Sequence, residues 1–175
     1  LSDTKATFTT YPEKGSFKFG NSAVRSFHED INKRLWVGTK GSGIFVLSHN
    51  RPGERIIEKQ FTTDNGLINN SVYALCGGPS EIWIGTDGKG LNYYDLKTGR
   101  MEKLAVPDSL HNNLSSVYAI IHDGKDGLWV GTSGHGIFHI DLNRLAKPYQ
   151  VAGIRQLSHT GEPGSISNNI VYSMI

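Results

Sequence analysis

The amino-acid sequence predicts an all-β protein made of repeated four-stranded antiparallel units, and three observations support this. Three tryptophans, Trp36, Trp83 and Trp129, lie 47 residues (36 to 83) and then 46 residues (83 to 129) apart. Each belongs to a similar stretch, namely LWVGTKGSGIF, IWIGTDGKGLNYYDL and LWVGTSGHGIFHIDL. Apolar residues alternate or form short runs, without the i, i+3, i+4, i+7 spacing of an amphipathic helix. A repeat of about this length is typical of propeller blades or of linear arrays.

The strands are clearest in the middle unit. They read VYALC at 72–76, EIWIGT at 81–86, LNYYDL at 91–96 and MEKLAV at 101–106. The segments between them, GGPS, DGKG and KTGR, are rich in residues that favour tight turns. This unit is therefore predicted to be a four-stranded meander.

The other units follow from the asparagine-rich stretches NSAV, NNSV, NLSSV and NNIV that precede each first strand. Four-stranded sheets of this kind pack radially in rings of roughly 4 to 8 blades. Three complete blades with one extra strand at each end do not close a ring, so we expect one domain, 1–175, that forms an arc of a β-propeller. The expected blades are 21–62, 69–106 and 113–159, and the expected end strands are 6–11 and 169–175.

Residues that recur in all three units are expected to be structural. A glycine-rich turn after a strand could also cradle a phosphate, but that chemistry needs a helix after the turn, and here a strand-like segment follows. We interpret the recurring residues as blade architecture: Trp36, Gly38, Thr39, Trp83, Gly85, Thr86, Trp129, Gly131 and Thr132.

Composition excludes several function classes. With 18 Lys+Arg against 16 Asp+Glu, the net charge is only +2, and the scattered basic residues form no nucleic-acid-binding stripe. The single cysteine, Cys76, excludes an internal disulfide and is expected to be a small buried strand residue. No apolar run reaches the roughly 18 residues that span a bilayer, and no basic signal region follows Leu1. We therefore expect a processed or excised segment that contacts a membrane only through regions outside it.

Histidines raise the question of metal binding or catalysis. His135 and His139 are four residues apart, which on a strand is about 13 Å and too far for one zinc ion. The segment 122–127 resembles a calcium loop only loosely, since Lys125 stands where an oxygen ligand is needed. We expect no catalytic residue, metal or cofactor here. An enzymatic alternative, a propeller lyase or hydrolase with a histidine general base, requires a histidine and a carboxylate that converge at one site.

A binding site is predicted from the geometry of blades. In propellers, the turns between second and third strands and the linkers between blades meet at one rim. These segments are expected at 39–42, 86–90, 132–136, 63–70, 108–115 and 160–169. Their polar residues could bind a sugar, although Asn and Asp also favour turns for conformational reasons. The candidate ligand residues are Lys40, Asn69, Asp87, Lys89, Asn112, His135 and Asn168.

The three WVGT or WIGT stretches, each preceded by the Asn-rich turn, resemble the two-component regulator propeller repeat. The first unit departs from the pattern at 46–49, where VLSH stands in place of Tyr94-Asp95 or Ile140-Asp141. In that family, such repeats form the periplasmic or extracytoplasmic sensor region of bacterial hybrid histidine kinases, many of which respond to oligosaccharides. The repeat motif itself encodes no ligand residue.

The resemblance implies a non-enzymatic sensing segment that recognises an oligosaccharide and signals to a kinase. Its partners would be the remaining blades and kinase region of the same chain, in a homodimer, with no nucleic acid bound by this segment. Two alternatives stay open: the lyase or hydrolase above, and an interaction scaffold that senses nothing.

Overall fold

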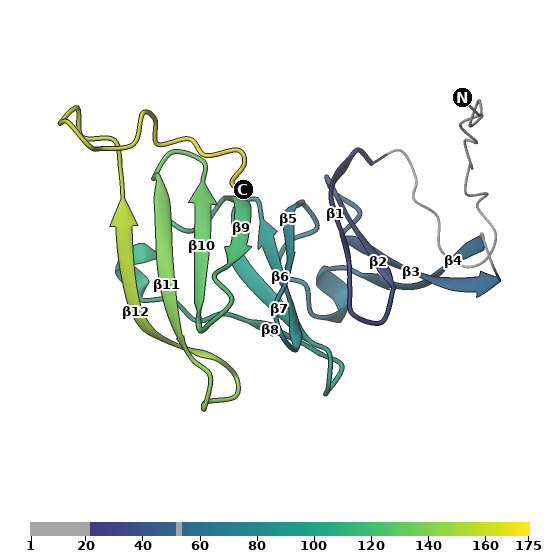
Figure 1. Cartoon of the computed structure of the whole chain (residues 1–175). Coiled ribbons are helices and arrows are strands. Elements are labelled where there is room, and N and C mark those ends of the chain that lie inside the picture. Colours follow the sequence, from purple (N-terminus) through teal and green to yellow (C-terminus); the bar gives the residue numbers. More distant parts are fainter. Residues whose placement is uncertain (1–21, 52–53) are drawn as a thin grey trace, which may run out of the picture.

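The computed structural model describes residues 22–51 and 54–175, which form twelve strands in three separate four-stranded antiparallel sheets (Figure 1). The first blade contains β1 (Val24–Glu29), β2 (Leu35–Thr39), β3 (Ile44–Arg51) and β4 (Glu54–Phe61). The second contains β5 (Val72–Gly77), β6 (Glu81–Thr86), β7 (Gly90–Asp95) and β8 (Arg100–Lys103). The third contains β9 (Val117–His122), β10 (Gly127–Thr132), β11 (Ile137–Asn143) and β12 (Gln150–Leu157).

Short 3-10 helices, Thr63–Asn65 and Asp108–Leu110, lie in the linkers between the blades. Across 22–51 and 54–175, no helix has the length and apolar character needed to cross a membrane.

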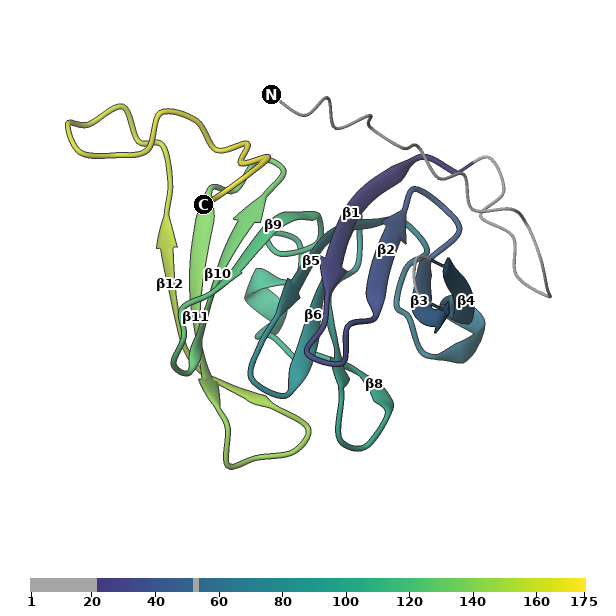
Figure 2. The ribbon, with the colours of Figure 1, turned by 45° about the vertical axis from the view of Figure 1, so that its right-hand side comes forward.

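Each sheet is a meander whose strands follow chain order. The first strand of the second blade, β5, contacts both β1 and β9, whereas β4 and β12 lie at opposite sides of the molecule (Figures 1 and 2). The sheets therefore spread as a fan around an inner edge formed by their first strands. This confirms the predicted fold class, an all-β propeller-like arc of four-stranded antiparallel blades.

The two ends of the arc differ from the expectation. The strand expected at 6–11 lies outside the described residues. The strand expected at 169–175 is not formed, since the segment makes only an isolated bridge between Ser133 and Ile170, and 171–175 has no strand. First strands elsewhere pair with the second strand of their own blade, whereas no described strand pairs with 171–175.

The main apolar contacts lie between neighbouring blades. Trp36 and Phe61 of the first blade pack against Ile82, Ile84 and Tyr94 of the second. In the same way, a cluster that includes Trp83 of the second blade packs against the third blade. The exposed fractions of Trp36 and Trp83 are 1% and 0%, while Trp129 at the end of the arc is only partly buried. Successive sheets therefore bury each other's faces.

The buried indoles are fixed by carboxylates near the start of the second strand, from Asp30 in the turn before β2 and from Glu81, the first residue of β6. Trp36 Nε1 donates to Asp30 Oδ2 over 2.9 Å, and Trp83 Nε1 donates to Glu81 Oε1 over 3.2 Å. Burial raises the pKa of Asp30, but hydrogen bonds from Trp36 and Arg34 outweigh it, and the net pKa lies below its ordinary value. Each carboxylate thus stays charged while it orients a buried ring.

A row of stacked aromatic rings runs along the inner edge of the arc. Tyr73 and Tyr118 each follow the first valine of their blade, and Tyr172 occupies the equivalent position after Val171. The ring centroids of Tyr73 and Tyr118 are 4.9 Å apart, and those of Tyr118 and Tyr172 are 5.6 Å apart. The Arg25 guanidinium lies 5.2 Å from the Tyr73 centroid. One side chain from each unit joins this row, so neighbouring units contact each other here as well.

The second strands carry a glycine because the next blade approaches it closely. A Cβ at Gly85 would lie 2.6 Å from Val117 Cγ1, inside van der Waals contact. The same clash would arise between Gly38 and Val72 and between Gly131 and Val171. The glycine of the WVGT motif therefore admits the first valine of the following unit.

We expect Gly43→Ala to lower the free energy of unfolding of the full chain by about 3 kcal/mol, measured by urea denaturation. Gly43 has φ of +72°, and a Cβ there would lie 1.9 Å from the carbonyl oxygen of Phe61. The matched control is Gly124→Ala, where φ is +79° but no atom lies within 4 Å, so only backbone strain of about 1 kcal/mol is expected. Equal costs at the two positions would contradict this account.

Candidate functional site

The turns between second and third strands lie against the linkers that lead into the next blade. In the first blade, the N–H groups of Gly41 and Gly43 donate to the carbonyl oxygen of Asn70 over 3.0 and 2.9 Å. The other turns repeat this pattern, with Gly88 and Gly90 bound to Ser115 and with Gly134 and Gly136 bound to Asn169. Each turn is thus brought together with one linker, which produces a rim of paired segments.

Three of the seven candidate ligand residues are used for structure. Asn69 donates from Nδ2 to the Asp87 carbonyl over 2.6 Å and accepts from the Ser71 N–H. Asp87 Oδ1 accepts from the Ser116 hydroxyl over 2.8 Å, and Asn168 Oδ1 accepts from the Ile170 N–H over 2.8 Å. These side chains hold turns and linkers in place.

The remaining four candidates differ in their surroundings. Lys40 and His135 are exposed on the turns of the first and third blades, outside the cavities described below. The His135 N–H donates to Thr132 Oγ1, so its backbone belongs to the turn. Lys89 and Asn112, by contrast, line one cavity of the second blade.

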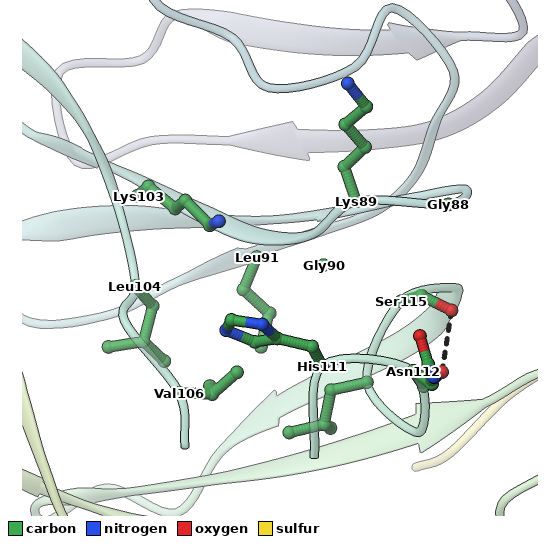
Figure 3. Close-up of a pocket in the computed structure, with 11 residues that line it drawn as sticks. Gly88, Lys89, Gly90, Leu91, Lys103, Leu104, Val106, His111, Asn112 and Ser115 are labelled. Carbon is green, nitrogen blue, oxygen red and sulfur yellow. Dashed lines mark hydrogen bonds between the residues drawn. The ribbon is translucent and has the colours of Figure 1, made fainter. Parts of the chain in front are cut away.

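This cavity, of about 240 Å³, lies between the 86–90 turn and the 104–115 linker (Figure 3). One part of its lining is apolar and consists of Leu91, Leu104, Val106 and Leu114. The polar part consists of Lys89, Lys103, His111, Asn112 and Ser115. We call this the rim cavity.

The rim cavity is open because the second blade lacks a hydrogen bond that its neighbours have. Gln60 in the first blade donates to the carbonyl oxygen of Ser42 over 3.0 Å, and Gln156 in the third donates to that of His135 over 2.8 Å. Each glutamine pairs, on the neighbouring third strand, with the residue that comes two positions after the second glycine of the turn. In the second blade, Lys103 occupies this position. Among the described residues, no side chain donates a hydrogen bond to the carbonyl oxygen at the middle of this turn.

The second unit also lacks a hydrogen bond within its linker that the other two units have. Asn70 Oδ1 accepts from the Thr63 N–H over 2.8 Å, and Asn169 Oδ1 accepts from the His159 N–H over 2.6 Å. At the matching position the second unit has Ser115, whose shorter side chain instead donates to the Asn112 carbonyl over 2.8 Å (Figure 3). The second unit therefore lacks the asparagine contact that joins the two ends of the linker in the other two units.

Charge at the rim cavity is mainly positive. Lys89 and Lys103 are exposed, and neither side chain makes an ion pair with any described residue. His111 Nδ1 lies 3.6 Å from Asp108 Oδ1, and Asp108 is fully exposed. Lys103, His111 and Ser115 were not among the residues expected from the sequence. Alignment of the three last strands and linkers would have singled out Lys103 and Ser115.

A second cavity, of about 360 Å³, lies beside the β11–β12 loop and is bounded partly by Tyr93, Asp95 and Lys147. Lys147 Nζ lies 2.8 Å from Asp95 Oδ2 and 3.8 Å from the Tyr149 ring centroid. Tyr149 donates its N–H to Tyr93 Oη over 3.0 Å. These groups bind each other across the interface of the second and third blades, so this cavity is a weaker ligand candidate than the rim cavity.

The buried Glu81 belongs to the same interface. Its carboxylate accepts from Arg144 Nη1 over 3.0 Å and from Tyr149 Oη over 3.1 Å. Burial raises the pKa of Glu81, but bonds from Ser80, Arg144 and Tyr149 more than offset it and lower the net pKa. A charged Glu81 thus fastens the β11–β12 loop of the third blade to the second.

Histidine and cysteine do not assemble into a metal site in the part of the chain that the structure describes. His139 is buried, lies 3.4 Å from Asp123 Oδ2 and packs on Trp129 with ring centroids 4.4 Å apart, whereas His135 is exposed on a turn. Cys76 is partly buried on β5, and burial raises the pKa of its thiol, which keeps it protonated.

Comparison with known proteins agrees with the repeats and the blade geometry. The family model of the two-component regulator propeller matches residues 18–41. A two-component regulator propeller repeat is therefore recognised over this segment of the chain. Histidine kinase P4 of Formosa agariphila is 33% identical over 118 residues, which cover 66% of this chain and 8% of that protein.

Solved structures show the same fold. The extracellular domain of the hybrid two-component system BT4673 from B. thetaiotaomicron matches with a TM-score of 0.61 and 21% identity, over 87% of this chain and 19% of that one. The corresponding domain of BT3049 matches with a TM-score of 0.58 and 25% identity, over 82% of this chain and 18% of that one. The chain thus spans less than a fifth of each of these relatives.

We expect Asp95→Asn to lower the free energy of unfolding of the full chain by about 1 to 2 kcal/mol at neutral pH. Burial raises the pKa of Asp95, but Lys147 and the N–H groups of Thr98 and Lys97 outweigh it and lower the pKa from 3.8 to about 2. The charged form is therefore the stabilising one. Its contribution is complete above the unfolded pKa of 3.8 and is lost as pH falls through about 2.

Urea denaturation of wild type and variant between pH 7 and pH 3 measures this difference. The gap between the two proteins should narrow as the pH falls below about 4. A gap that is constant over the whole range would show that the Asp95 charge contributes nothing.

Proposed function

We propose that this chain is part of the sensing propeller of a two-component histidine kinase, and that it recognises an oligosaccharide and relays its presence to the kinase. The observation that carries the proposal is the rim cavity, a polar concave site on a blade of a fold shared with extracellular domains of hybrid two-component systems. Sites of this kind, with an apolar floor and a few polar groups at the edge, are typical of small-ligand recognition.

The proposal includes the location and partners of the chain. The segment would lie on the periplasmic or other extracytoplasmic side of the inner membrane. This location is supported by the similar solved structures, which are extracellular domains. The remaining blades would cover the Trp129 face, which is only partly buried here. A kinase region of the same chain, in a homodimer, would receive the signal as a change in packing.

One observation favours a second candidate function, a lyase or hydrolase. His111 lines the rim cavity and lies 3.6 Å from Asp108, so a histidine and a carboxylate are close to a possible substrate position. The pair is exposed and longer than a hydrogen bond, which makes it a weaker basis than the cavity itself. Turnover of an oligosaccharide that His111→Ala abolishes would establish this alternative.

Calorimetric titration of the full chain with a panel of neutral and acidic oligosaccharides tests the sensing function. We expect one class to bind with micromolar to millimolar affinity and with no product formed over hours, as a sensor requires. Light scattering with and without the bound sugar then tests the relay, because a scaffold would show no ligand-linked change of assembly. Absence of binding to every glycan would contradict sugar sensing.

A further inference from the structure

We propose that the rim cavity of the second blade binds an acidic sugar unit, with its carboxylate or sulfate bound by Lys103. This inference rests on the proposed sensing function and specifies its ligand class and subsite. It follows from how the second unit departs from the two units beside it.

The departure that opens the cavity is also the one that supplies its charge. The repeat position occupied by Gln60 and Gln156 carries Lys103 in the second blade, and the middle of the turn carries Lys89 where the first blade has Ser42. Loss of the glutamine leaves the Lys89 carbonyl without its closing hydrogen bond, since no described side chain donates to it. The second blade thus lacks the glutamine hydrogen bond and carries the ammonium group of Lys103 at the same position.

Anions suit the polar side of the cavity. Lys103 carries an ammonium group without an ion-pair partner among the described residues, and His111 projects into the cavity from the linker, whereas the Lys89 side chain points away from the other lining side chains, as Figure 3 shows. Charge-assisted hydrogen bonds from ammonium to carboxylate or sulfate are about twice as strong as neutral ones. Asp108, near His111, is the one acidic group with a recorded contact to this polar lining, and it is fully exposed.

Sugars suit the rest of the cavity. Leu91, Leu104 and Leu114 are almost fully buried and Val106 is partly buried, so they supply a small apolar area that suits the C–H face of a pyranose ring. Asn112 and the free Lys89 carbonyl could bind ring hydroxyl groups. A volume of about 240 Å³ lies below the roughly 300 to 1,000 Å³ of sites for drug-sized ligands, so it fits one sugar unit of a longer chain.

The test restores the repeat. Lys103→Gln, alone and with Ser115→Asn, reintroduces the two closing side chains that the first and third blades already have, so the variants should fold. Lys125→Gln is the matched control, because it removes the same charge from the exposed turn before β10, away from the rim cavity. Thermal unfolding of each full-chain variant checks the fold.

The probes are trigalacturonate, its neutral counterpart galactotriose, and a sulfated chondroitin disaccharide, each titrated calorimetrically. We expect the full chain to prefer an acidic probe, and Lys103→Gln to weaken its binding about tenfold, whereas Lys125→Gln leaves it unchanged. Affinity should also fall with added salt, because the contact is ionic. A response to the sulfated probe alone would support the site with sulfate as the anion.

Other results would overturn the inference. If Lys103→Gln binds an acidic probe as the wild type does, or if galactotriose binds equally well, the rim cavity is not an acidic-sugar site, although oligosaccharide sensing would stand. If no glycan binds the wild type, both the subsite and the sensing function fail. Should Lys103→Gln not fold, Lys103→Met, which removes the charge and keeps an unbranched side chain on β8, gives the same test.

Discussion

The arc depends on one repeated contact, the pair of backbone hydrogen bonds that each glycine turn donates to the carbonyl of the next linker. Gly41 and Gly43 bind Asn70, and the two later turns repeat the arrangement. Because all donors and acceptors are main-chain atoms, the contact fixes the position of the next blade whatever side chains the turn carries. The apolar faces, the indole rings and the tyrosine row can then meet in register.

Repetition of this contact does not make the interfaces identical. The first interface buries Trp36 beside an Asp30 carboxylate, while the second adds an ionic network in which Glu81 and Lys147 hold the β11–β12 loop across two blades. Burying a charge costs free energy of desolvation, which hydrogen bonds and ion pairs must offset. The carboxylates of Asp30 and Glu81 each accept several hydrogen bonds. The second interface is therefore held by ionic contacts as well as by apolar packing.

Much of the fold could be predicted from the sequence, because the repeat period, the turn glycines and the alternation of apolar residues each determine structure within a short stretch of chain. The middle strands were placed within a few residues, whereas the expected end strand at 169–175 holds one isolated bridge, at Ile170. The site was harder to predict. Asn69, Asp87 and Asn168 have the polarity of ligand residues, but their hydrogen bonds are used within the fold. Lys103 lies on a strand outside the turns considered, and its role appears only when it is compared with the register of Gln60 and Gln156.

The backbone character of the turn contact bears on how such chains diversify. The contact between units is made by main-chain atoms of turn glycines and linker carbonyls, so the middle residue of a turn and the last strand beside it can differ from blade to blade. One blade can gain a recognition surface while its neighbours keep their closing glutamines. In a propeller built this way, each blade can carry its own side chains at the rim without any change in the backbone contacts that position its neighbours.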